Sequence, residues 1–94
     1  MRKVTQRIKE AFEQGEHLKV GNTRTNGRSV FLHGNEIIKR DHSGRIWFTF
    51  AGWGTPTTRE RIKGITGANV YQHKHEQYVY GKVNLDLHHW FHVR

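Results

Sequence analysis

The sequence predicts an α+β fold in which two short helices accompany antiparallel strands. Three observations support this class. Apolar residues recur at helical spacing near the N-terminus. Strand-forming residues then alternate with the turn signals of antiparallel hairpins. Pro56, followed by a Thr-x-x-Glu pattern, marks the start of a second helix.

The first element is an amphipathic helix expected from Arg2 to Gln14. Its apolar face holds Val4, Ile8, Ala11 and Phe12, and polar or charged residues occupy the other face. Gly15 is a suitable stop, because glycine readily adopts the left-handed conformation that ends many helices.

Residues 23–50 predict a four-stranded antiparallel meander. Asn26-Gly27 and Gly34-Asn35 are two-residue turn signals, and residues 41–44 form a longer loop. The expected strands are Thr23–Thr25, Ser29–His33, Glu36–Arg40 and Arg45–Phe50.

Counting from a turn at Gly34-Asn35 predicts the two faces of this meander. Leu32 would face Ile37, and His33 would face Glu36, an acid/base-capable pair. The expected core face comprises Val30, Leu32, Ile37, Ile46, Phe48 and Phe50. The second face comprises Phe31, Ile38 and Trp47, bordered by His33, Arg40 and Arg45.

The rest of the chain predicts a helix from Thr58 to Ile65, capped by Thr57 and Glu60 and ending near Gly67. A hairpin and a closing strand follow, at Val70–His73, Gln77–Tyr80 and Trp90–Val93. With 94 residues, the chain is expected to form a single domain spanning residues 1–94.

Composition restricts the classes of function. There is no cysteine, which excludes disulfides, thiolate metal sites and thiol nucleophiles. Sixteen Lys and Arg oppose eight Asp and Glu, giving a formal net charge of +8. Such a charge favours binding to nucleic acid. It would also suit an acidic protein partner, or serve only for solubility.

No enzyme signature is present: neither a phosphate-binding Gly-rich loop nor a Gly-x-Ser-x-Gly or His-Glu-x-x-His motif occurs. The N-terminus lacks a signal-peptide pattern, and no run is long enough to span a membrane. We therefore expect a non-enzymatic cytoplasmic protein without a membrane partner. The hairpin edges leave homodimerisation open.

Two blocks resemble a family of small, largely uncharacterised proteins of tailed bacteriophages. The first runs through Gly21-Asn22-Thr23-Arg24 and Leu32-His33-Gly34-Asn35-Glu36-Ile37. The second is Ala51-Gly52-Trp53-Gly54-Thr55-Pro56-Thr57-Thr58-Arg59-Glu60-Arg61-Ile62. The resemblance implies a phage origin, and thus the cytoplasm of a host cell, but no reaction.

The first candidate site is the second face of the meander. Phe31 and Trp47 could stack on bases while Arg40 and Arg45 pair with phosphates. Alternatively, one of the two helices covers these rings.

The second candidate site is the start of the second helix. Helix N-terminal N–H groups, the hydroxyls of Thr55 and Thr58, and the charges of Arg59 and Arg61 suit a phosphate, with Trp53 nearby. The alternative is an ordinary helix cap with solvated arginines.

Histidines form the third constellation. His73 and His75 on one strand face, with a histidine from the C-terminal segment, could supply three nitrogen ligands for zinc. Their position near a turn favours surface groups instead, so no metal or cofactor is predicted.

Three functional hypotheses remain open. The favoured one is a nucleic-acid-binding accessory protein, for DNA or RNA. The second is an inhibitor that binds a host protein, and the third is a small histidine-using nuclease.

Overall fold

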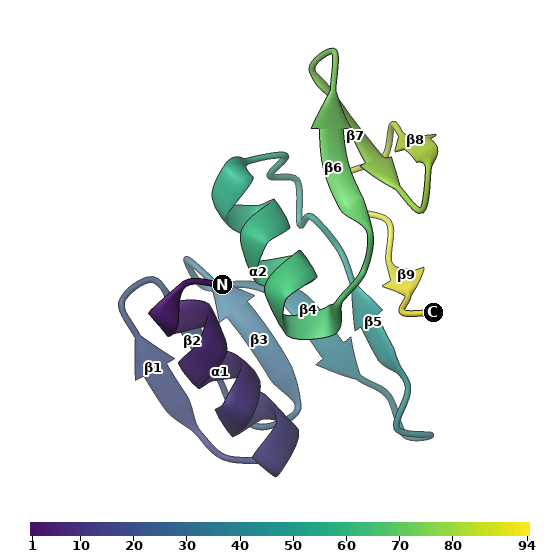
Figure 1. The fold of residues 1–94 in the computed structure, drawn as a ribbon. Coiled ribbons are helices and arrows are strands. Elements are labelled where there is room, and N and C mark those ends of the chain that lie inside the picture. Colours follow the sequence, from purple (N-terminus) through teal and green to yellow (C-terminus); the bar gives the residue numbers. More distant parts are fainter.

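The computed structural model describes residues 1–94 as two helices packed on one side of an antiparallel sheet, with a second small sheet beside them (Figure 1). The main sheet has the strand order β1-β2-β3-β4-β5-β9, and the small sheet the order β6-β7-β8. All strand pairs are antiparallel, which confirms the α+β class.

The observed elements follow the predicted order. The helices are α1 (Lys3–Gln14) and α2 (Pro56–Thr66). The main sheet contains β1 (Leu18–Val20), β2 (Thr23–Thr25), β3 (Ser29–Leu32), β4 (Asn35–Arg40), β5 (Ile46–Phe48) and β9 (Phe91–His92). The small sheet contains β6 (Val70–His73), β7 (Glu76–Val79) and β8 (Lys82–Asn84). Neither helix has the length and apolar character needed to cross a membrane.

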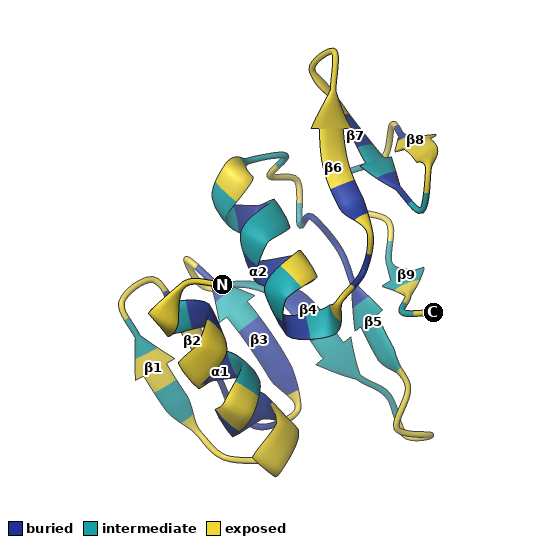
Figure 2. Ribbon diagram, viewed as in Figure 1, coloured by how far each residue is buried: buried dark blue, intermediate teal, exposed yellow.

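The helix α1 forms where its apolar periodicity predicts. Ile8, Ala11 and Phe12 are buried against the sheet, while the outward side of the helix is exposed (Figure 2). Gly15 ends the helix in the left-handed conformation, with φ of 73°. The turn residue Gly27 packs directly on it, because a Cβ at Gly27 would lie 2.5 Å from the Gly15 carbonyl carbon.

The predicted register between β3 and β4 was wrong. The two-residue turn is His33-Gly34, with φ values of 51° and 82°, the positive values that a type I′ turn requires. Leu32 therefore pairs with Asn35 rather than Ile37. The pairing then shifts by one residue at a β-bulge, which leaves Ile37 unpaired.

The bulge explains how two consecutive isoleucines are both buried. Ile38 pairs with Val30 and Phe48, and these three side chains lie under the helices. Ile37, the extra residue, is also in the core, with an exposed fraction of 1%. Ile38 was expected on the opposite face, so that assignment was wrong.

The small sheet extends the same core past the end of β5. Val70 and Val79 pair across β6 and β7, and both are buried. The ring of Tyr80 meets Phe48 edge-on, with ring centroids 6.3 Å apart. In Figure 1 this sheet stands beyond α2, away from β1 and β2.

Candidate nucleic-acid interface

The face of the main sheet opposite the helices is uncovered. α1 contacts β1, β2 and β3, and α2 contacts β4, all on the face that holds Val30 and Ile38. Directly opposed residues share a face of the sheet. The pairings therefore define the other side, here called the open face: Lys19, Arg24, Ser29, Phe31, Glu36, Lys39, Trp47 and His92.

Aromatic rings on the open face lie against cations. The Arg24 guanidinium carbon lies 3.9 Å from the ring centroid of Phe31. Lys39 Nζ lies 4.0 Å from the ring centroid of Trp90, which immediately precedes β9. The rings of Phe31 and Trp90 are half-buried, so part of each surface is accessible to solvent. Rings and charges thus alternate across neighbouring strands.

Trp47 is held at one end of this face by Asp41, a residue of the β4–β5 loop. The indole Nε1 donates a hydrogen bond to Asp41 Oδ2 at 2.8 Å. The hydroxyl of Ser43 donates to Oδ1 at 2.6 Å. These hydrogen bonds, from Ser43 first and then Trp47, hold the pKa of Asp41 well below its ordinary value because they favour the carboxylate. The ring of His92 lies 5.2 Å from that of Trp47.

The carboxylates of this face are occupied by the protein's own hydroxyls and N–H groups. Glu36 accepts a hydrogen bond from the Ser29 hydroxyl at 2.6 Å, and Asp41 has the donors described above. Two of the sixteen Lys and Arg side chains form ion pairs, Lys9 with Glu13 and Arg61 with Glu60. The cations of the open face are therefore free to meet an external anion.

The structure keeps Phe31, Trp47 and Arg45 together at the predicted second face but removes Arg40 from it. Arg45 is exposed and, by alternation along the chain, lies on the side of Trp47. Arg40 points to the helix side, where it donates to Gly27 O at 2.7 Å and to Phe12 O at 3.2 Å. Its guanidinium lies over the Phe12 ring, so it serves packing.

The start of α2 differs from the predicted capping box. Thr55, not Thr57, is the N-cap, and its hydroxyl accepts from Thr58 N at 3.2 Å. Pro56 occupies the first turn because it has no N–H to satisfy there and its fixed φ suits the helix. The hydroxyls of Thr55 and Thr58 also bond to each other at 2.9 Å, so both are engaged by the cap.

Arg61 is an internal structural residue and not a surface anion ligand. It is 3% exposed and donates to Thr23 Oγ1 at 2.9 Å and to Thr5 Oγ1 at 3.1 Å. It also pairs with Glu60. The group ties α2 to α1 and β2. The expectation that Arg61 meets a phosphate was wrong, because the amphipathic pattern of α2 does not reveal a buried arginine.

Arg59 and Trp53 complete this region. Arg59 is half-buried and bridges to the small sheet, donating to Gln77 Oε1 at 2.8 Å and to Gly54 O at 3.1 Å. Trp53 is 57% exposed. Of the predicted residues at this end of α2, Trp53 thus remains accessible to a ligand.

The histidines do not form a cluster. His73 ends β6, whereas His75 lies in the following turn with φ of 68°, so they do not share a strand face. No group of three or more His, Asp or Glu side chains is placed to hold a metal ion. His33, expected opposite Glu36, is a turn residue, and Glu36 pairs with Phe31 instead.

Sequence reasoning missed Lys19, Arg24, Lys39, Trp90 and His92 as members of one face. Lys19 had a readable signal, since the alternation Leu18-Lys19-Val20 is typical of a half-buried strand. The positions of the other four depend on how the strands pair. That pairing is determined by loops whose lengths the sequence did not reveal.

The comparisons with known proteins identify the family but no activity. The family model described as Kyanoviridae Gp96 protein matches residues 1–92, and the chain belongs to this family. Kyanoviridae is a phage family, so the resemblance to small phage proteins is confirmed. No curated protein and no solved structure matches the chain.

Proposed function

We propose that this member of the Kyanoviridae Gp96 protein family is a non-enzymatic accessory protein that binds single-stranded nucleic acid on its open face, in the host cytoplasm. The observation that carries the proposal is the alternation of half-exposed rings with cations free of carboxylate partners on a sheet face that no helix covers. Bases offer a π-face to the rings, and phosphates offer a charge to the cations.

Energetics favour exchange of the internal cation–π contacts for contacts to a nucleotide. An exposed cation–π pair contributes about 0.5–1 kcal/mol. Stacking of one base on an aromatic side chain contributes about 1–3 kcal/mol. Arg24 is exposed, so it can leave the ring of Phe31 and pair with a phosphate of the same nucleotide. Each such exchange therefore makes binding more favourable, because the base stack contributes more than the cation–π pair that is lost.

The open face suits a single strand better than a duplex. In a duplex the bases are stacked inside, where the rings of Phe31, Trp47 and Trp90 cannot reach their π-faces. The cations of α1 do not make a comparable site, since they alternate with Glu10 and Glu13 and have no exposed ring among them.

The test is binding of a fluorescein-labelled oligothymidylate, measured by fluorescence anisotropy over a series of KCl concentrations. Lys19, Arg24, Lys39 and Arg45 together predict a slope of log K against log salt of about −3, from about 0.7 per phosphate contact. Arg24→Gln should reduce the slope by about 0.7. The matched control is Arg7→Gln on the exposed side of α1, which should leave it unchanged.

Phe31→Leu tests stacking separately from charge. It should weaken binding by about 1–3 kcal/mol with the salt slope intact. Absence of binding at low salt, or equal effects of Arg24→Gln and Arg7→Gln, would refute the proposal.

The second candidate function is binding of a host protein through the outer side of the small sheet. Tyr71, Tyr78 and Val83 pair across β6, β7 and β8, so they share one face. The two tyrosine rings stack with centroids 5.1 Å apart, and Tyr71 and Val83 are 37% and 43% exposed. An exposed apolar strip of this kind favours a protein partner.

Affinity purification from host lysate, carried out with and without nuclease treatment, separates the two candidates. A stoichiometric protein partner that Val83→Glu abolishes supports the second candidate. Recovery of nucleic acid, with loss of all partners after nuclease treatment, supports the first.

A further inference from the structure

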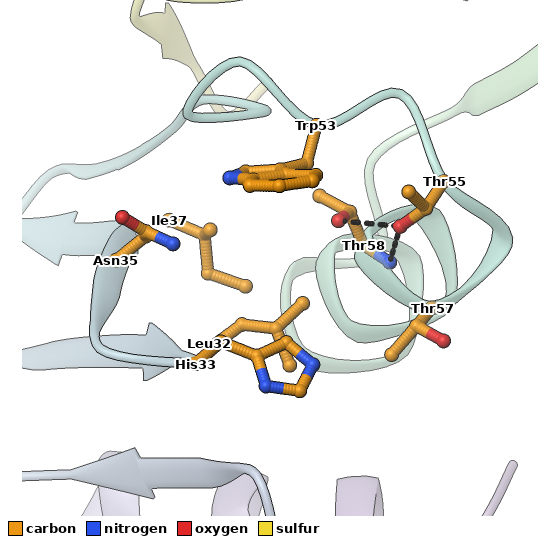
Figure 3. A pocket seen from close by; sticks show the side chains of 8 residues that line it. All are labelled: Leu32, His33, Asn35, Ile37, Trp53, Thr55, Thr57 and Thr58. Atoms are coloured by element: carbon orange, nitrogen blue, oxygen red, sulfur yellow. Dashed lines mark hydrogen bonds between the residues drawn. The ribbon is translucent and has the colours of Figure 1, made fainter.

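A cavity of about 460 Å³ lies between the β3–β4 turn, the loop before α2 and the first turn of α2 (Figure 3). Its apolar lining comes from Leu32, Ile37 and Trp53. In Figure 3 the indole of Trp53 lies along one side of the cavity, and His33 lies at the opposite side. The space between them is bounded by flat or apolar surfaces.

The rim of this cavity carries polar side chains without partners in the protein. The hydroxyls of Thr55 and Thr58 bond to each other and are therefore engaged. The side chains of His33, Asn35 and Thr57 also line the cavity, and they form no hydrogen bond within the chain. Imidazole, amide and hydroxyl groups together supply both donors and acceptors.

A second, smaller hollow of about 230 Å³ lies beside this cavity. The two hollows share His33, and the smaller one is also lined by Lys19 and Arg24 of the open face. The turns that bound it are held together, because His33 N donates to Asn22 O at 2.8 Å. Two cations of the open face, Lys19 and Arg24, thus line the hollow next to the cavity.

We propose that the cavity beside Trp53 receives one base of the strand that occupies the open face. This inference rests on the proposed function. The nucleotide backbone passes Lys19 and Arg24 at the end of the sheet, and the base turns inward over His33 to stack on the Trp53 indole. Asn35 and Thr57 then meet the hydrogen-bonding edge of the base.

The chemistry of the cavity matches a nucleobase. The volume falls in the range of about 300–1,000 Å³ typical of small-molecule sites. A base is planar, apolar on its faces and polar at its edge. Its faces would contact the indole and the apolar walls of the cavity, and its edge would contact the polar rim. Positive charge at the entrance matches the phosphate that accompanies the base.

The experiment places a fluorescence reporter in the cavity alone. In a Trp47→Phe, Trp90→Phe variant, Trp53 is the remaining tryptophan, and aromatic rings are retained on the open face. Addition of oligothymidylate should quench Trp53 fluorescence with the same midpoint as the anisotropy change.

Trp53→Ala should weaken oligonucleotide binding about 5- to 150-fold, the range for loss of one base stack, without changing the salt slope. Trp53→Phe should recover part of that loss. Asn35→Ala should reduce discrimination among homopolymers of different bases. Circular dichroism checks that these variants are folded. We expect the Trp53 variants to fold, because an exposed side chain contributes little to the core.

The outcomes separate the cavity from the open face. Binding with a normal salt slope, but with unchanged affinity in Trp53→Ala and no quenching of Trp53, would overturn the cavity proposal and leave the open-face proposal intact. Absence of any oligonucleotide binding by the unmodified protein would overturn both.

Discussion

Replacing Arg61 with methionine should destabilise the fold without changing the open face. Arg61 is 3% exposed, and its guanidinium serves acceptors on α1, the β1–β2 turn and β2, in addition to Glu60. Methionine fills much of the same volume but leaves the Glu60 carboxylate without its cationic partner, so that inside the fold only the Thr5 hydroxyl still donates to it. The fold therefore loses a buried charge pair and gains an unpaired charge.

The expected magnitude follows from this geometry. Breaking a buried ion pair costs about 3–5 kcal/mol. The Glu60 side chain is 24% exposed and can regain some hydration, which favours the lower end, about 3 kcal/mol. A domain of this size has a total stability of about 5–14 kcal/mol. The variant should therefore remain folded at low temperature, with Tm lowered by about 12–24 °C.

Thermal and urea denaturation followed by circular dichroism measure this change. Arg59→Met is the matched control, because Arg59 is half-buried with two hydrogen bonds, and its loss should cost about 1 kcal/mol. A Glu60→Gln, Arg61→Met double variant should cost less than the sum of the single changes, since no unpaired carboxylate remains. Equal Tm values for Arg61→Met and Arg59→Met would refute the structural role. If Arg61→Met had normal stability but no longer bound oligonucleotide, Arg61 would instead be a residue that contacts the ligand.

Three further predictions concern stability and pH. Because hydrogen bonds lower the pKa of Asp41 in the folded state, its carboxylate stabilises the fold above the unfolded-state pKa of about 4, and this contribution is lost as the pH falls further. Asp41→Asn should therefore flatten the acid limb of the stability curve, measured by urea titrations at several pH values; an unchanged acid limb would contradict this. Gly64→Ala would stabilise an ordinary helix by about 1 kcal/mol, but here a Cβ would lie 2.5 Å from Thr5 Cγ2, so we expect a lower Tm that Thr5→Ser restores. Arg40→Gln should lower the unfolding free energy by about 1–3 kcal/mol through its lost carbonyl contacts while leaving oligonucleotide affinity unchanged, which separates it from Arg24.

The fold was predictable from the sequence where periodicity and turn chemistry agreed. α1 has its predicted end at Gln14, and β2 and β6 have their predicted bounds. β1 was missed although its alternation Leu18-Lys19-Val20 was readable, and β8 was missed because a three-residue strand leaves little periodicity to read. The β3–β4 register was wrong because His33 takes the positive φ that glycine or asparagine usually supplies.

The candidate site was predictable only in part, because it depends on which face each side chain occupies. Phe31 and Trp47 share a face as expected even though the predicted register was wrong, because the bulge in β4 shifts the pairing back by one residue. Arg40 and Arg61 were not placed correctly, because their inward orientation depends on acceptors distant in the chain, such as Phe12 O and Thr5 Oγ1. Sequence patterns report that an arginine is polar, but not that the fold provides it with buried partners.

The most direct test of the open-face account is a titration of the isotope-labelled protein with oligothymidylate, followed through backbone amide and tryptophan indole chemical shifts. The account predicts shifts along β1 to β5 and at the indoles of Trp47 and Trp90, with α1 and the exposed side of α2 unaffected. Shifts confined to the helices or to the small sheet, or none at saturating oligonucleotide and low salt, would contradict it.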